Sequence, residues 1–131
     1  RENTPKYIKE AILAGYDVEV DVWFVEGEFW LGHDKPEVLI SEKYLENRRL
    51  WCHAKNKDAL EKMIENRKIH CFWHQDDDIQ LTSQGYLWTY PNKPYGKNSI
   101  CVLPTSPEKI EGAAGLCLDD FSKVFNLTGE K

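Results

Sequence analysis

The sequence lacks the features that would assign it to a membrane or to a nucleic-acid surface. No apolar stretch approaches the roughly 18 residues of a membrane span. The first ten residues, RENTPKYIKE, lack the apolar core of a signal peptide. Acidic residues outnumber basic ones by 22 to 17, which gives a net charge of -5, so we expect no broad nucleic-acid footprint. These absences favour a soluble, cytoplasmic protein.

Cysteine pairs of the C-x-x-C type are also missing. The four cysteines stand singly inside apolar runs, at Cys52, Cys71, Cys101 and Cys117. We interpret them as reduced core thiols of a reducing compartment, with disulfide bonds or metal ligation as the alternatives. At 131 residues and 41% hydrophobic content, the chain is large enough for one globular domain without covalent support.

Short apolar strands alternate with helices or turns along the chain, which is the rhythm of an α/β fold. Thr4 is suited to N-cap a helix over residues 5–14, and residues 17–23 alternate polar and apolar with the period of a strand. Further strands are expected at 28–34, 50–55, 69–74, 79–91, 99–104 and 115–118, and further helices at 41–47, 57–66 and 121–127.

Polar side chains lie at the C-terminal ends of these strands, the edge at which parallel α/β sheets and barrels hold their active sites. Residues two apart on a strand point the same way, so Glu19 and Asp21 offer two carboxylates to one point. His53 and Lys55 likewise place an imidazole beside an ammonium group. Together they could cradle a divalent cation and an anionic group. The alternative is that Glu19 and Asp21 lie on a solvated face of an antiparallel sheet.

Single histidines and tryptophans carry weaker signals. His33, which precedes Asp34, is either a catalytic group or a turn histidine held by its neighbour. We interpret His70 as a half-buried structural residue. Most of the five tryptophans lie inside strand runs and are interpreted as core, whereas Trp88 is placed near a site.

Three segments near the N-terminus occur in an order and spacing that resemble a known family. They are Glu2-Asn3-Thr4 before a helix that ends at Ala14-Gly15, Val18-Glu19-Val20-Asp21-Val22, and Leu31-Gly32-His33-Asp34 after Gly27. Over about the first 35 residues, the chain resembles the glycerophosphodiester phosphodiesterases of the phosphatidylinositol phospholipase C-like superfamily. Weaker matches follow at Leu50–Lys55, Leu87-Trp88-Thr89 and Gly115–Asp119.

The resemblance implies a (β/α)8 barrel of the TIM type. Such barrels have about 250 residues, so we expect a reduced α/β barrel in which loops replace several helices and residues 1–131 form one domain. Seven strands are expected within the chain. The eighth is the first strand, which carries the family's His-Arg-Gly motif and one catalytic histidine, and it is expected upstream of Arg1.

The resemblance also implies hydrolysis of a small phosphodiester with a divalent cation and a pair of histidines as general acid and base. Glu19 and Asp21 match the metal carboxylates, and Lys55 matches a phosphate-facing lysine. His33 matches the histidine that protonates the leaving alcohol.

Two substrate-side positions and one departure complete the implied site. Glu2 matches a residue at the edge of the site, and Trp88 lies in the segment that resembles the family's late Trp-Thr strand. His53 stands where the family has a third metal carboxylate. Carboxylates favour Mg²⁺ or Ca²⁺, whereas an imidazole makes Mn²⁺ or Zn²⁺ more plausible than in the family. The alternative is that His53 ligates nothing.

Two classes of function follow from this reading. The first is a metal-dependent phosphodiesterase that acts on a glycerophosphodiester-type substrate. The second is a non-catalytic relative that binds a phosphorylated ligand or partner at the same mouth. A His-Arg pair encoded before Arg1 favours the enzyme.

Overall fold

A computed structural model of the chain describes residues 3–91, 93–103 and 112–118. The chain divides into two compact units, Arg1–Gln75 and Asp76–Lys131, and each is described by itself. None of the helices in the described ranges is long and apolar enough to cross a membrane.

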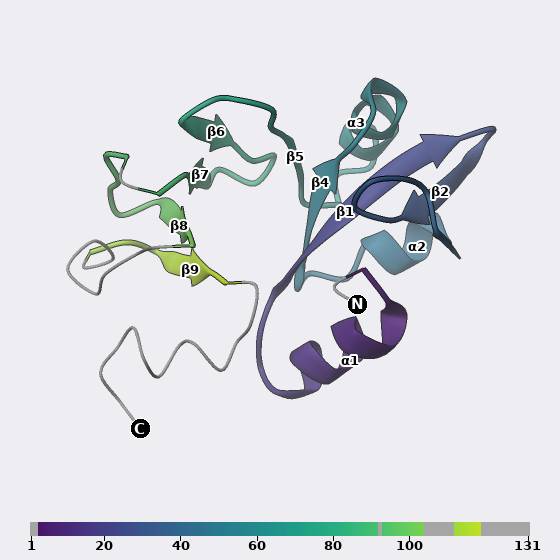
Figure 1. Cartoon of the computed structure of the whole chain (residues 1–131), viewed down its shortest axis with the longest axis horizontal. Coiled ribbons are helices and arrows are strands. Elements are labelled where there is room, and N and C mark those ends of the chain that lie inside the picture. The colour runs from purple at the N-terminus through teal and green to yellow at the C-terminus, as the bar shows by residue number, and fades with distance from the viewer. Residues whose placement is uncertain (1–2, 92, 104–111, 119–131) are drawn as a thin grey trace. The chain divides into compact units, whose positions relative to one another are not determined.

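The first unit is built on a five-stranded mixed sheet with the strand order β3-β2-β1-β4-β5. Figure 1 labels four of these strands, β2, β1, β4 and β5. Its strands are β1 (Val18–Val25), β2 (Glu28–Leu31), β3 (Val38–Ile40), β4 (Leu50–Ala54) and β5 (Cys71–Trp73). β1 runs antiparallel to β2 and parallel to β4, and β4 runs parallel to β5. The C-terminal ends of β1, β4 and β5 therefore meet at one edge of the sheet.

Each helix of the first unit begins at a side chain that caps it. These helices are α1 (Pro5–Leu13), α2 (Glu42–Leu45) and α3 (Lys57–Ile64). The side-chain oxygens of Thr4, Ser41 and Asn56 accept the backbone N–H three residues on. Because the first N–H groups of a helix have no partner within it, these bonds fix where each helix begins.

The alternation of β1 separates the two faces of the sheet. Val18, Val20 and Val22 point to the apolar face, which packs against side chains from all three helices. Buried helix residues in this core are Ile8, Ala11, Leu45, Ala59 and Met63. The opposite face of β1 carries the side chains of Glu19, Asp21 and Trp23.

The second unit contains a four-stranded sheet in the order β6-β7-β8-β9. The strands are β6 (Ile79–Leu81), β7 (Leu87–Thr89), β8 (Ser99–Val102) and β9 (Gly115–Cys117). β6 and β7 are antiparallel, whereas β7, β8 and β9 run parallel. Trp88 is buried in this unit.

The prediction of a (β/α)8 barrel is wrong. Over the described residues the chain forms two separate mixed sheets and three short helices, and neither sheet closes on itself. One physical reason lies at Glu26 and Gly27, which alone connect β1 to β2 and both have positive φ. A turn of two residues reverses the chain into an antiparallel hairpin, whereas a barrel strand needs a crossover of a dozen residues or more.

Most expected elements are confirmed with bounds that differ by a few residues. The single strand expected at 79–91 is wrong, because this segment forms two short antiparallel strands, β6 and β7, and β3 was not expected. The expected helix at 121–127 and the acidic pair Asp119 and Asp120 lie outside the described residues. None of the four cysteines forms a disulfide bond, and Cys52, Cys71 and Cys101 are buried. Burial raises the pKa of Cys52 well above its ordinary value, which keeps this thiol protonated.

Candidate metal centre

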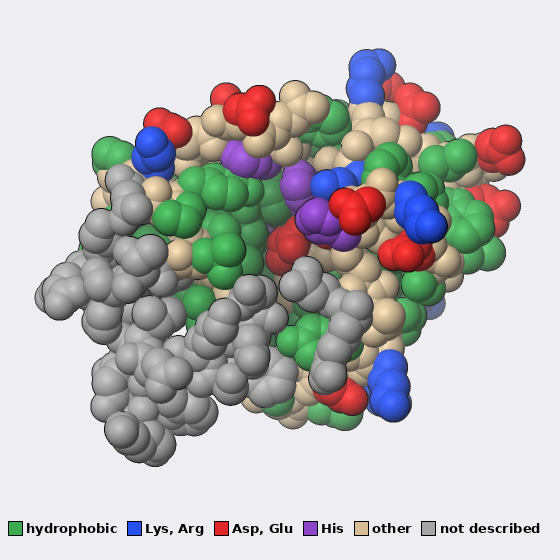
Figure 2. All heavy atoms as spheres, viewed as in Figure 1, with side chains coloured by type: hydrophobic (Ala, Val, Ile, Leu, Met, Phe, Trp, Pro, Cys, Tyr) green, Lys and Arg blue, Asp and Glu red, His purple; other side chains and the backbone are tan. Residues whose placement is uncertain are grey.

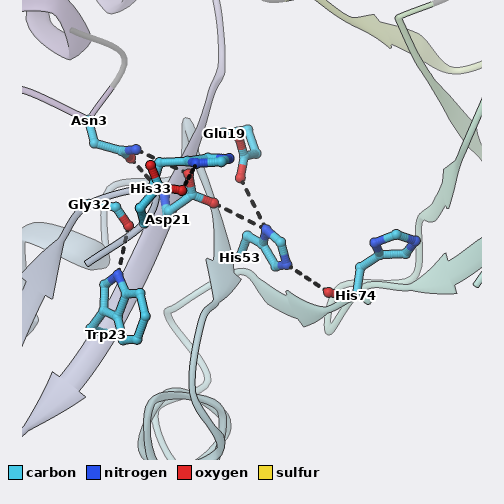
Figure 3. Close-up of polar contacts among 9 residues, drawn as sticks. Asn3, Glu19, Asp21, Trp23, Gly32, His33, His53 and His74 are labelled. Atoms are coloured by element: carbon cyan, nitrogen blue, oxygen red, sulfur yellow. Dashed lines mark hydrogen bonds and ion pairs between the residues drawn. The ribbon is translucent and has the colours of Figure 1, made fainter. Parts of the chain in front are cut away.

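The candidate centre lies on the polar face of the first sheet, where β1 and β4 run side by side. In their parallel register, Asp21 is the partner of His53 and Glu19 is the partner of Trp51. Because paired residues of adjacent strands point to the same face, the side chains of Glu19, Asp21 and His53 converge. Figure 3 shows both carboxylates directed toward the His53 ring.

The three side chains are close enough to share one ion. Their possible ligand atoms all lie within 4.8 Å of one another. His53 Nδ1 is 3.1 Å from Asp21 Oδ1 and 3.7 Å from Glu19 Oε2. Histidine and acidic side chains also lie next to each other near the middle of the face that Figure 2 shows. We refer to Glu19, Asp21 and His53 as the trio.

Asp21 is the most buried member of the trio, with 4% of the residue exposed. Burial alone raises the pKa of its carboxyl, but the hydrogen bonds from His53 and Asn3 outweigh burial and leave the pKa below the ordinary 3.8. Asp21 is therefore a carboxylate at neutral pH. A buried anion of this kind needs compensating positive charge, from a proton on His53 or from a cation.

The orientation of His53 is fixed by contacts on both sides of its ring. Nε2 lies 3.1 Å from the backbone carbonyl oxygen of His74. A carbonyl can only accept, so Nε2 carries a proton and donates it. The ring also stacks on Phe72 at 5.1 Å between centroids, with an interplanar angle of 7°. These contacts leave Nδ1 to face the two carboxylates.

This arrangement fits a divalent cation. An imidazole nitrogen and two carboxylates form a mixed donor set that suits Mn²⁺ or Zn²⁺ as well as Mg²⁺. Metal-binding histidines ordinarily donate their second ring N–H to a carbonyl or carboxylate, as His53 does to His74. In the absence of an ion, a second proton on Nδ1 gives the same compensation through an ion pair with Asp21.

The structure places His33 at the end of β2, close to the backbone of Asp21. The N–H of Gly32 donates to the Asp21 carbonyl oxygen at 3.1 Å, and the Gly32 carbonyl accepts from Trp23 Nε1 at 2.7 Å. The His33 side chain itself is 68% exposed, and its Nδ1 lies 3.0 Å from Asp34 Oδ1. The ring thus pairs with its neighbour, as the turn interpretation predicted.

The other predicted site residues fall in three different places. Lys55 follows β4 directly, is half-buried, and its N–H donates to the Val22 carbonyl oxygen at 2.8 Å. Trp88 belongs to the second unit. Glu2 lies outside the described residues. The structure thus brings together the three predicted metal ligands.

Sequence reasoning missed two groups that contact the trio. One is the His74 carbonyl oxygen, which the parallel alignment of β4 and β5 brings to the His53 ring. The other is Asn3, whose side chain bonds to Asp21 across 18 positions of sequence. The sequence predicted a role for Glu2 in the same short segment, but no sequence pattern indicated that the neighbouring Asn3 amide would be buried against Asp21.

Comparisons with known proteins yield no relative from which a role could be transferred. No protein-family model matches the chain, and no curated protein or solved structure is significantly similar to it. The geometry of the trio is therefore the basis for a function.

Proposed function

We propose that this chain is a metal-dependent phosphodiesterase that cleaves a glycerophosphodiester-type substrate. The observation that carries the proposal is the convergence of Glu19, Asp21 and His53 from two parallel strands, with ligand atoms within 4.8 Å of one another. The resemblance of residues 2–34 to the glycerophosphodiester phosphodiesterases supports the choice of substrate class. The barrel implied by that resemblance is not part of the proposal.

The trio would hold the cation, with Glu19 and Asp21 as oxygen ligands and His53 Nδ1 as the nitrogen ligand. A bound divalent cation supplies positive charge to a phosphate oxygen as negative charge develops on it. The chain's own contribution is to keep Asp21 ionised and His53 oriented, through Asn3 and the His74 carbonyl. Two orienting contacts of this kind are typical of metal centres.

Two side chains outside the trio would take the remaining roles. Lys55 lies two residues after His53 and would pair with the anionic substrate. His33, exposed and hydrogen-bonded to Asp34, would protonate the leaving alkoxide. A histidine suits this role because its ordinary pKa is near neutral. Glu2, which lies outside the described residues, and Trp88, which is buried in the second unit, have no role in this proposal.

The first test is thermal unfolding of the full chain with and without millimolar Mg²⁺, Ca²⁺, Mn²⁺ or Zn²⁺. An ion at about 100 times its dissociation constant stabilises a fold by roughly 2.7 kcal/mol. We expect the melting temperature to rise by several degrees with at least one ion, and Asp21→Asn to abolish the rise.

A matched control is Asp58→Asn, which removes the same charge from an exposed position on α3. That helix packs on the opposite face of the sheet. The ion response should be unchanged in this variant. A rise that persists in Asp21→Asn, or no rise with any ion, would contradict the proposed centre.

One observation favours a second function, the binding of a phosphorylated ligand without catalysis. Both ring nitrogens of His53 have oxygen partners within the protein, so a doubly protonated His53 satisfies the trio without an ion. The two functions differ in their need for metal. Binding of glycerol phosphate that persists in a chelator, with no turnover in any ion, would favour the binding protein.

A further inference from the structure

Asn3 makes two hydrogen bonds to Asp21, one to the backbone and one to the side chain. Its Oδ1 accepts from the Asp21 N–H at 2.8 Å, and its Nδ2 donates to Asp21 Oδ2 at 3.1 Å. The amide orientation follows from chemistry, because a backbone N–H can only donate and a carboxylate can only accept. Figure 3 shows the pair of bonds.

The two oxygens of Asp21 are thereby given different partners. Oδ2 is held by Asn3, whereas Oδ1 lies 3.1 Å from His53 Nδ1. A carboxylate held at one oxygen and at its own backbone N–H cannot turn freely about its side-chain bonds. Oδ1 is therefore kept on the side of His53 and Glu19.

Asn3 is itself firmly placed. Only 9% of the residue is exposed, and the next residue, Thr4, caps α1. That helix is anchored in the core through Ile8 and Ala11. The position of the Asn3 amide is therefore set by the packing of a whole helix on the sheet.

Asn56, the N-cap of α3, also bonds to β1 through its side-chain amide and so provides a comparison with Asn3. Its Oδ1 accepts from the Phe24 N–H at 3.2 Å, and its Nδ2 donates to the Phe24 carbonyl oxygen at 3.0 Å. Both bonds reach the backbone, so Asn56 fastens β1 to the start of α3. Asn3 differs because its amide N–H reaches a carboxylate of the trio.

We propose that Asn3 is a positioning residue for the metal centre, which holds Oδ2 of Asp21 so that Oδ1 is the oxygen offered to the ion. This inference rests on the proposed function, since it requires that the trio bind a divalent cation. The inference goes beyond the proposed function because it assigns a role to a side chain outside the ligand set and distinguishes the two oxygens of Asp21.

The test compares Mn²⁺ affinity, by titration calorimetry, and the Co²⁺ absorption spectrum in the full chain and its variants. In Asn3→Ala we expect Mn²⁺ to bind about 10- to 100-fold more weakly, the loss typical when the partner of a metal ligand is removed. We also expect a changed Co²⁺ d–d spectrum, because a released Asp21 carboxylate can bind through both oxygens. A purely structural role would move neither the spectrum nor the affinity of the folded protein.

Asn3→Asp keeps the test decisive if Asn3→Ala fails to fold. It preserves the size of the side chain and an acceptor for the Asp21 N–H, but it replaces the donor with an anionic oxygen that repels Oδ2. We expect this variant to fold and its Co²⁺ spectrum to differ from that of the parent. Asn56→Ala is the matched control, which should lower the melting temperature but leave the spectrum and the Mn²⁺ affinity unchanged.

The outcomes separate the two proposals. Absence of ion binding by the parent chain overturns the proposed function and this inference with it. Parent binding that is lost in Asp21→Asn, but matched within about twofold by both Asn3 variants with an unchanged spectrum, overturns this inference alone.

Discussion

The rings of Trp51 and His70 lie 4.2 Å apart between centroids, inclined by 44°. Trp51 belongs to β4, and its indole N–H donates to Asp17 Oδ2 at 3.0 Å. His70 is almost fully buried, with 3% of the residue exposed. Burial lowers the pKa of His70 from 6.5 to about 4, although the Asp17 carboxylate opposes the shift.

His70 is expected to make the fold less stable in mild acid. The unfolded chain protonates this histidine below about pH 6.5, but the folded chain does so only below about pH 4. Between these values the unfolded state holds more protons, so the free energy of unfolding falls as the pH is lowered from about 6.5 to about 4. Each unit of pKa difference corresponds to about 1.4 kcal/mol at most.

The measurement is urea unfolding at a series of pH values for the parent and for His70→Phe, which keeps a ring beside Trp51. The slope between pH 4 and pH 6.5 should be shallower in the variant. A His70 proton resonance that titrates near pH 6.5 would contradict this prediction.

Gly32→Ala is expected to displace the turn that carries His33. A Cβ at Gly32 would lie 1.8 Å from the backbone oxygen of Lys35, so the backbone must move. We expect a loss of stability of roughly 1–3 kcal/mol and, in the enzyme, a loss of turnover. Gly96→Ala is the control, since a Cβ there meets no atom within 4 Å. Its stability should stay within about 0.5 kcal/mol of the parent.

Two neighbouring residues of α3 should respond very differently to truncation. Met63 is fully buried in the core, whereas 57% of Ile64 is exposed. Met63→Ala leaves a cavity and should cost about 2–5 kcal/mol in the free energy of unfolding. Ile64→Ala should change it by less than about 0.5 kcal/mol. Equal losses in denaturant unfolding would mean that α3 does not pack on the sheet through Met63.

If His33 is the general acid, the loss of hydrolysis rate in a His33 variant should depend on the leaving group of the substrate. His33→Ala should slow hydrolysis of an alkyl phosphodiester far more than that of a nitrophenyl phosphodiester, whose leaving group needs no proton. Steady-state rates on the two substrates, each relative to the parent, give the comparison. A similar fractional loss on both would exclude the acid role.

The sequence predicted individual elements better than their arrangement. The alternation of residues 17–23 identified β1, and the Thr4 cap located the start of α1. Strand direction was the main failure, because a period-two pattern is the same in parallel and antiparallel sheets. The Glu26-Gly27 turn did contain the missing information, since two residues can only form a hairpin.

The site was predicted where it depends on strand register and missed where it depends on packing. Glu19 and Asp21 share a face by spacing alone, and a parallel neighbour brings His53 beside them. The approach of Asn3 depends instead on how α1 packs across the sheet. No local pattern contains that packing, because it is decided by contacts between segments far apart in sequence.

The parallel pairing of β1 and β4 has a kinetic consequence. Asp21 and His53 are 32 positions apart, and the chain between them contains β2, β3 and α2. An ion bound to both would act as a cross-link that must break before the two central strands separate. If the unfolded chain has no preformed site, ion concentration should slow unfolding while leaving the rate of refolding nearly constant. The centre would then increase the kinetic stability of the fold, because a bound ion lengthens the lifetime of the folded state.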